Sequence, residues 1–107
     1  MTVQFTWNGN GGSLSSPSPQ LNIGNIPDGT VSFNVKMKDL DRKRFDHGGG
    51  TAVNDGTGVI PVGALKNYKG PQPPAPEVHT YVFTVSAIDA NGQVIGTGTA
   101  SHKYPGN

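Results

Sequence analysis

Three stretches of this sequence place histidine, aspartate and glycine where they could bind a small anion. Each lies beside a candidate strand, and the residues are Asp39-Leu40-Asp41, Asp46-His47-Gly48-Gly49-Gly50, and Gly70-Pro71-Gln72-Pro73-Pro74 with its continuation His79-Thr80-Tyr81. A carboxylate can orient an imidazole so that it donates an N–H to an anion. A Gly/Pro-rich loop adds accessible backbone N–H groups. If the stretches converge, they suit a phosphate-sized anion.

These stretches must be positioned by strands. Residues 30–38 alternate apolar and polar side chains, a period of two that predicts a half-buried strand. Residues 80–88 are largely apolar on both faces, which predicts a central strand. Weaker strands are expected at residues 3–7 and 93–101, the latter joined to the central strand through the turn Asp89-Ala90-Asn91-Gly92. The last two strands therefore form a hairpin.

The rest of the chain is rich in turn residues. Gly and Pro supply 25 of the 107 residues, about twice the roughly 12% of average proteins. They cluster in expected loops at 8–19, 27–29, 47–58 and 70–76. No segment has helical periodicity, so helix is limited to a turn around 62–67. We expect an all-β, antiparallel sandwich with long Gly/Pro-rich loops and little or no helix.

Some of these loops are expected to be well ordered and others flexible. Loops of more than about 12 residues in a small domain are commonly functional or disordered. The loops that start at Asp46 and Gly70 would form the pocket and should be ordered against each other. Residues 8–16 are expected to be a flexible connection.

Composition excludes several classes of protein. The net charge of +1 gives no long-range field toward nucleic acid, and the absence of cysteine excludes disulfides and thiolate metal sites. No apolar run reaches the roughly 18 residues of a membrane span, and the N-terminus lacks a signal-peptide pattern. We expect a single cytoplasmic domain over residues 1–107, with no cofactor.

Six motifs also occur in a characteristic order. They are Ser18-Pro19-Gln20-Leu21, Pro27-Asp28-Gly29-Thr30-Val31-Ser32-Phe33, Asp39-Leu40-Asp41, Phe45-Asp46-His47, Tyr68-Lys69-Gly70-Pro71-Gln72-Pro73-Pro74 and His79-Thr80-Tyr81-Val82-Phe83. This order resembles the phosphatidylethanolamine-binding protein family, which includes the Raf-kinase-inhibitor-like bacterial proteins. The resemblance runs from about Ser18 to Ile88.

The resemblance implies a Greek-key β-sandwich with a pocket at one end for phosphate, acetate or phosphoryl head groups. Asp39 and Asp41 match the two acids of the family motif, and His47 matches the histidine that follows. The other matching ligand-binding residues are Gly70 and Gln72, on the loop whose N–H groups face the anion, and the pair His79 and Tyr81. The partner would be a small anion or phosphorylated head group.

The sequence also departs from the family. Leu40 replaces the proline between the two acids, Asp46 and Gly48 replace aromatics beside the histidine, and Ile23 replaces a tryptophan. The family's C-terminal helical segment is not found after the last strand. The pocket is therefore expected to be more open and more polar.

Other interpretations stay open at this point. The pocket could be degenerate, leaving a structural or interaction protein that acts through a protein partner, as a monomer or homodimer. An Asp/His/His metal site is chemically allowed, and an enzyme is least favoured because no nucleophile–base pair is visible. Five of the eight positive charges lie within nine residues, at Lys36, Lys38, Arg42, Lys43 and Arg44. They form either a solvated face or a docking site for an anionic group.

Overall fold

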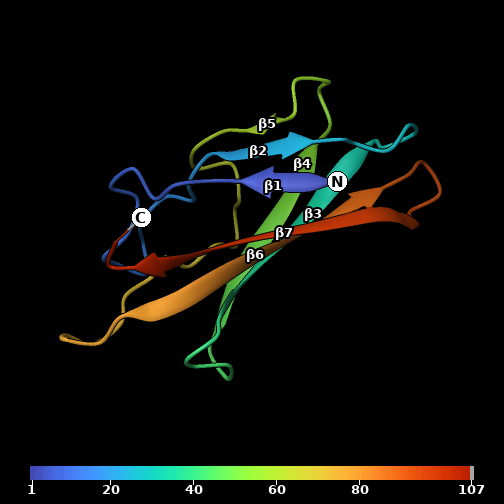
Figure 1. Cartoon of the computed structure of the whole chain (residues 1–107). Helices are drawn as coiled ribbons and strands as arrows, with labels where there is room; N and C mark the ends of the chain where they lie inside the picture. Colours follow the sequence, from blue (N-terminus) through green and yellow to red (C-terminus); the bar gives the residue numbers. More distant parts are fainter. Residues whose placement is uncertain (107) are drawn as a thin grey trace.

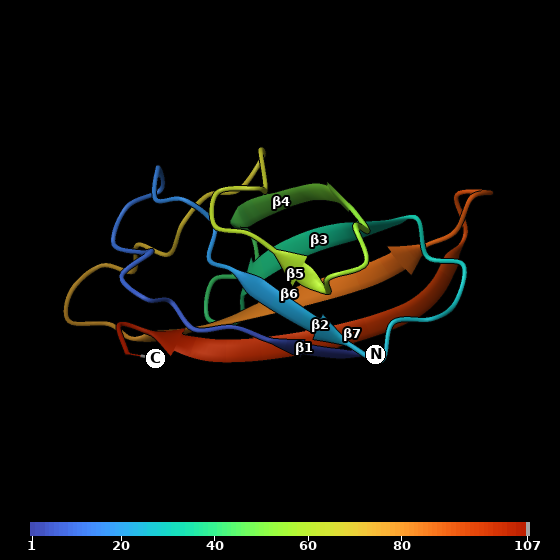
Figure 2. The ribbon, with the colours of Figure 1, turned by 90° about the horizontal axis from the view of Figure 1, so that it is seen from above.

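Two antiparallel β-sheets pack face to face in the computed structural model, which describes residues 1–106 (Figures 1 and 2). The larger sheet has the order β4-β3-β6-β7 and is formed by β3 (Ser32–Asp39), β4 (Asp46–Val53), β6 (His79–Ile88) and β7 (Val94–Tyr104). The smaller sheet has the order β1-β2-β5 and is formed by β1 (Thr2–Gln4), β2 (Leu21–Gly24) and β5 (Val59–Ile60). The predicted all-β antiparallel sandwich is confirmed.

The alternating pattern of β3 and β6 determines which side chains enter the core. Phe33, Val35 and Met37 of β3 are buried, and the intervening residues face outward. On β6 the inward positions include Phe83 and Val85, both fully buried. β6 lies between β3 and β7, so its predicted central position is confirmed. Burying each large apolar side chain contributes about 1.5–3 kcal/mol.

The smaller sheet and the segment after β1 close the other side of the core. Phe5 and Trp7 are buried there, with their rings 5.1 Å apart in an edge-to-face arrangement. Trp7 Nε1 donates a hydrogen bond to the Lys103 carbonyl, 2.9 Å away. This bond ties the start of the chain to the end of β7.

β4 corrects one prediction, because residues 47–58 were expected to form a loop. Gly48 and Gly49 have positive φ angles of 66° and 151°. A Cβ on Gly48 would collide with the Asn67 carbonyl oxygen, and one on Gly49 with the Val35 carbonyl oxygen. The glycines therefore allow a strand to pass close to two neighbouring backbones, where a turn was expected.

The other elements agree with the predictions in part. The predicted hairpin joins β6 to β7, and β7 extends three residues beyond its predicted end, to Tyr104. The expected strand at 3–7 is limited to β1, and the strands β2 and β5 were not predicted. Residues 62–67 contain turns without a helix. Across residues 1–106 we find no helix with the length and apolar character needed to span a membrane.

The long loops gather at one end of the sandwich, near the C-terminus (Figures 1 and 2). Lys69 N–H donates to the His47 carbonyl over 2.8 Å, so the two expected pocket loops are ordered against each other, as predicted. The expectation that residues 8–16 form a flexible connection is wrong. Gly12 N–H donates to the Pro71 carbonyl (2.9 Å) and Gly70 N–H to the Leu14 carbonyl (3.1 Å), which fix this segment against the pocket loop.

Candidate functional site

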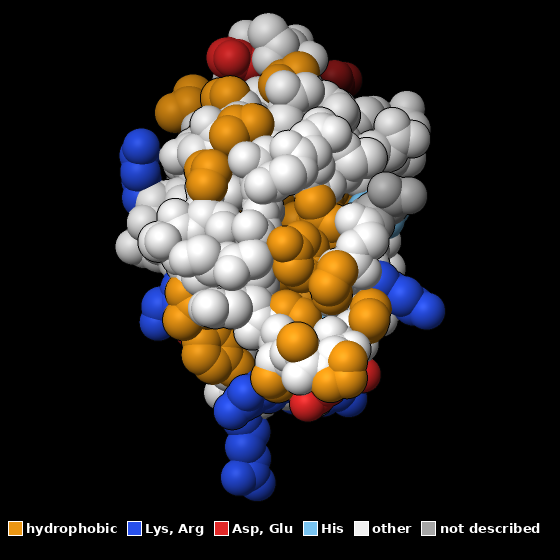
Figure 3. Space-filling model, turned by 90° about the vertical axis from the view of Figure 1, so that its left-hand side faces the viewer, with side chains coloured by type: hydrophobic (Ala, Val, Ile, Leu, Met, Phe, Trp, Pro, Cys, Tyr) orange, Lys and Arg blue, Asp and Glu red, His pale blue; other side chains and the backbone are white. Residues whose placement is uncertain are grey.

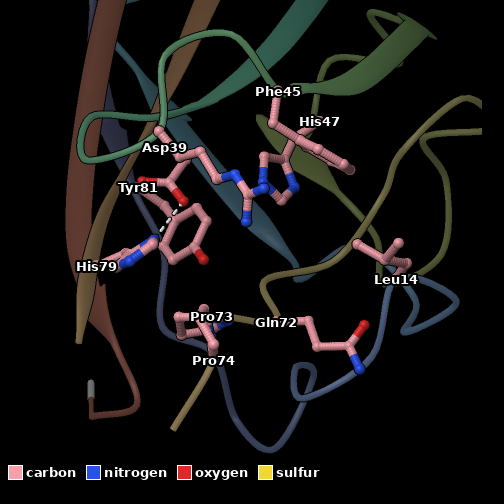
Figure 4. Close-up of a pocket in the computed structure, with 10 residues that line it drawn as sticks. Leu14, Asp39, Phe45, His47, Gln72, Pro73, Pro74, His79 and Tyr81 are labelled. Carbon is pink, nitrogen blue, oxygen red and sulfur yellow. Dashed lines mark hydrogen bonds and ion pairs between the residues drawn. The ribbon is translucent and has the colours of Figure 1, made fainter. Parts of the chain in front are cut away.

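A cavity of about 170 Å³ opens at the loop end of the sandwich (Figure 4). Five of the residues predicted from the sequence line it, namely Asp39, His47, Gln72, His79 and Tyr81. Five lining residues were not predicted as ligand contacts: Leu14, Arg42, Phe45, Pro73 and Pro74. The cavity therefore combines segments that are distant in sequence, as expected from the predicted convergence.

Asp39 is buried because it continues the inward-facing row of β3. It follows Met37 by two residues, is 2% exposed, and pairs in register with Tyr81 of β6. Its Oδ1 accepts the Asp41 N–H over 2.8 Å, and its Oδ2 lies 2.6 Å from His79 Nδ1. A buried carboxylate needs such partners, since leaving its charge uncompensated costs several kcal/mol.

His79 is held between two carboxylates. Its Nδ1 contacts Asp39, and its Nε2 lies 2.7 Å from Glu77 Oε1. Hydrogen bonds to Glu77 and then to Asp39 raise the pKa of His79 above its ordinary value, against the opposing effect of burial. With a carboxylate on each ring nitrogen, the imidazole is doubly protonated and acts as a cation.

His47 lies on β4 and turns inward toward the same cavity (Figure 4). Its Nδ1 is 2.7 Å from the Lys69 carbonyl oxygen, which can only accept, so Nδ1 carries a proton. Its ring packs between Phe45, at 4.6 Å, and Tyr81, at 5.2 Å and almost perpendicular. For the other ring nitrogen, Nε2, no hydrogen-bond partner is found among residues 1–106.

Tyr81 supplies a neutral hydroxyl to the cavity. Burial, followed by the nearby Asp39 charge, raises the pKa of this phenol well above its ordinary value. The hydroxyl therefore keeps its proton at all physiological pH values, and it can donate to an anion.

Arg42 is the functional residue that sequence reasoning missed as a cavity residue. After β3 the chain turns back, with Arg42 N–H donating to the Asp39 carbonyl and Phe45 N–H donating to the Arg42 carbonyl. This turn places Arg42 in the cavity lining. Within residues 1–106, Arg42 makes no ion pair with a carboxylate. One feature of the sequence could have predicted that Arg42 lines the cavity: it lies three residues after the inward-facing Asp39, where a turn follows the strand.

Asp41 and Gly70 were predicted as ligand contacts, but neither lines the cavity. Asp41 is exposed, and its Oδ2 accepts the Thr80 N–H over 2.7 Å, so it extends the β3–β6 pairing and does not orient an imidazole. The N–H of Gly70 bonds to the Leu14 carbonyl, so the expectation that it faces an anion is wrong. A Cβ on Gly70 would collide with the Ser13 carbonyl oxygen, which explains the glycine by packing.

The loop end carries cations around an apolar centre. Figure 3 looks onto this end and shows apolar side chains at the middle, with Lys and Arg side chains projecting at the margin. Lys69 Nζ lies 5.8 Å from the centre of the Phe45 ring, a cation–π distance. Across residues 1–106, no three His, Asp or Glu side chains are grouped as metal ligands. The N–H and O–H donors of Arg42, His47 and Tyr81 in the cavity lining suit recognition of an oxyanion.

Comparison of the sequence with known proteins does not identify a family. No protein-family model matches the chain, and a search of curated proteins finds no similar sequence.

Proposed function

We propose that this protein is a binding module whose loop-end cavity takes a small oxyanion or the phosphoryl group of a larger ligand. The observation that carries the proposal is Arg42, a guanidinium without a carboxylate partner among residues 1–106, in the same cavity as two histidines. A guanidinium is a rigid fork of donors that matches phosphate and carboxylate oxygens. An unpaired one beside imidazoles is well suited to hold such a group.

The other cavity residues complete the set of donors. Tyr81 contributes a neutral O–H, and His47 contributes Nε2, which becomes a donor when the ring is doubly protonated. The volume of about 170 Å³ is below the roughly 300–1,000 Å³ of cavities that enclose drug-sized ligands. It therefore suits a phosphate-sized group, and the remainder of a larger ligand would lie outside.

We extend the proposal to membership of the phosphatidylethanolamine-binding protein family in a divergent form. Its support is the sandwich, together with the gathering of Asp39, His47, Gln72, His79 and Tyr81 around one cavity. The family's binding of phosphorylated head groups agrees with the donor set described above.

The proposed binding depends on pH in a defined direction. The pKa of His79 is raised, so this imidazole keeps its positive charge above pH 6.5 and loses it as the pH rises through its folded-state value. Phosphate affinity is therefore expected to rise as the pH falls through the histidine range. Calorimetric titrations with phosphate from pH 5.5 to pH 8.5 measure this dependence.

Arg42→Ala tests the proposal, with Lys43→Ala as the matched control. Both substitutions remove one exposed cation from the same loop, but only Arg42 lines the cavity. A hydrogen bond to a charged group contributes about 1.5–3 kcal/mol, so we expect phosphate affinity to fall at least about tenfold for Arg42→Ala. Lys43→Ala should change it less than about threefold. Equal losses in the two variants would contradict the proposed site.

One observation favours a second candidate, an interaction protein with a degenerate pocket. Both ring nitrogens of His79 already contact carboxylates, so neither is free for a ligand while Glu77 stays in place. This candidate predicts no saturable phosphate binding at any pH between 5.5 and 8.5, and self-association or a protein partner as the measurable activity. Sedimentation analysis combined with the phosphate titration separates the two candidates.

A further inference from the structure

Glu77 places a carboxylate on the cavity histidine from outside. Its Oε1 lies 2.7 Å from His79 Nε2, and its side chain is 58% exposed, whereas the side chain of His79 is only 7% exposed. Asp39, the partner on the other nitrogen, has a side chain that is 3% exposed. The imidazole therefore has one partner fixed in the interior and one partner in contact with solvent.

These two partners should differ in how easily they leave. Asp39 is held by a second hydrogen bond from Asp41 N–H and by the β3–β6 pairing. The Glu77 carboxylate has His79 as its one hydrogen-bond partner within the described chain. The Glu77 carboxylate is the exposed member of its pair with His79, so water and salt compete for it, whereas Asp39 is shielded from both. Glu77 is therefore the exchangeable partner.

We propose that Glu77 is an internal anion which occupies the ligand position on Nε2 of His79, and that a bound oxyanion displaces it. This inference rests on the proposed function of the cavity. Glu77 follows the Gly/Pro-rich pocket loop, and its N–H donates over 2.8 Å to the carbonyl of Pro74, a residue that lines the cavity. The ligand would take the same N–H with an oxygen of its own and release the side chain to water.

Charge balance supports an exchange over simple addition. The charged and titratable groups around His79 come from every neighbouring element. They are Asp39 from β3, Asp41, whose Oδ2 accepts the N–H of Thr80, Glu77, His47 from β4, Arg42 and Tyr81 within the cavity, and Tyr104, the register partner of His79 on β7. With Glu77 in place, two carboxylates balance Arg42 and the charged His79. Once Glu77 leaves, Asp39 is the one carboxylate still in contact with the charged His79 among residues 1–106, and an anion can take the place of Glu77.

Glu77→Gln tests the displacement, with inorganic phosphate as the probe. The titration is performed at pH 5.5, below the ordinary histidine pKa of about 6.5, so that His79 stays protonated without Glu77. The neutral amide is a weaker competitor for Nε2, and we expect phosphate to bind about threefold to tenfold more tightly.

Asp46→Asn is the matched control. Asp46 directly precedes His47 and caps the Gly48 N–H over 2.7 Å, a bond that the Asn side-chain oxygen preserves. This variant removes the same charge near the cavity without touching His79. Its phosphate affinity should change less than about twofold, because only a competitor on Nε2 needs to be displaced.

A second measurement follows the displacement in the unaltered chain. The ¹³C resonance of the Glu77 carboxylate should move with phosphate, saturate at the same dissociation constant as the binding, and end at the position of a solvated carboxylate. If phosphate binds while this resonance stays fixed, or if Glu77→Gln binds no more tightly than Asp46→Asn, the displacement is refuted and the proposed function stands. If phosphate binds to none of these proteins, both proposals are refuted.

Discussion

Replacing Asp39 by Asn measures how much the buried carboxylate–imidazole pair contributes to stability. Asp39 and His79 are 2% and 5% exposed, and their side chains are 2.6 Å apart. The Asn side-chain oxygen can keep the hydrogen bond from Asp41 N–H, so the variant removes mainly the charge. We expect the fold to form and the free energy of unfolding to fall.

The size of the loss follows from the contacts. A hydrogen bond between charged groups contributes about 1.5–3 kcal/mol, and leaving a buried ion without its partner costs about 3–5 kcal/mol. His79 can avoid the larger cost by releasing its Nδ1 proton and keeping the Nε2–H bond to Glu77. The expected loss is therefore about 2 kcal/mol at pH 6. With a typical urea dependence of about 1–3 kcal/mol per molar, the unfolding midpoint should fall by roughly 1 M.

The pH dependence gives this prediction its direction. Because the folded-state pKa of His79 is raised, its stabilising contribution is fully present below the unfolded value of about 6.5 and is lost as pH rises through the folded value. The difference between the two proteins should thus be largest near pH 6 and shrink toward alkaline pH. Trp7, the single tryptophan and 2% exposed, reports unfolding by fluorescence. Equal midpoints at pH 6, or a difference that grows with pH, would refute the reasoning.

Four further substitutions test the packing of the fold and the charge of the site. Gly49→Ala should prevent folding or reduce stability by more than about 3 kcal/mol, because its Cβ collides with the Val35 carbonyl oxygen. Gly92→Ala, at a φ of 78° with open space around it, should cost only about 1–2 kcal/mol, and similar urea midpoints for the two variants would contradict this. Tyr68→Phe should raise the free energy of unfolding by about 1 kcal/mol, because the Tyr68 hydroxyl is buried without a hydrogen-bond partner among residues 1–106; a loss of stability would contradict it. Glu77→Gln should lower the pKa of His79 in an NMR pH titration, since the Glu77 hydrogen bond is the largest cause of its increase, and an unchanged value would show that the contact is not formed in solution.

The period-two pattern of residues 30–38 was sufficient to predict β3, and the apolar character of both faces of residues 80–88 was sufficient to predict β6 as a central strand. The same pattern explains why Asp39 and His79 face the interior, since each extends an inward-facing row. The grouping of Asp39, His79 and Tyr81 in one pocket was implied by the family resemblance, and the three residues do line one cavity. Whether they bind a ligand remains a prediction.

The remaining elements depended on contacts that local sequence does not record. Residues 48–50 have a loop-like composition, but their glycines form a strand because two neighbouring backbones pass too close for a Cβ. β5 has two residues, too few for a periodic pattern. Arg42 enters the cavity through the turn after β3, and sequence spacing did not reveal that turn. The contact between Glu77 and His79 could have been predicted from one signal. Glu77 lies two residues before His79, and residues two apart on an extended chain point to the same side.

An NMR titration of the unaltered protein with inorganic phosphate at pH 5.5 tests the central claim most directly. We expect saturable shifts of the Arg42 Nε–H, the imidazole resonances of His47 and His79, and the Gln72 backbone N–H. These shifts should share one dissociation constant, while Gly70 and the β5 residues stay unchanged. If the resonances of Arg42, His47 and His79 do not move, or if they move without saturation and together with residues across the surface, the cavity is not an anion-binding site.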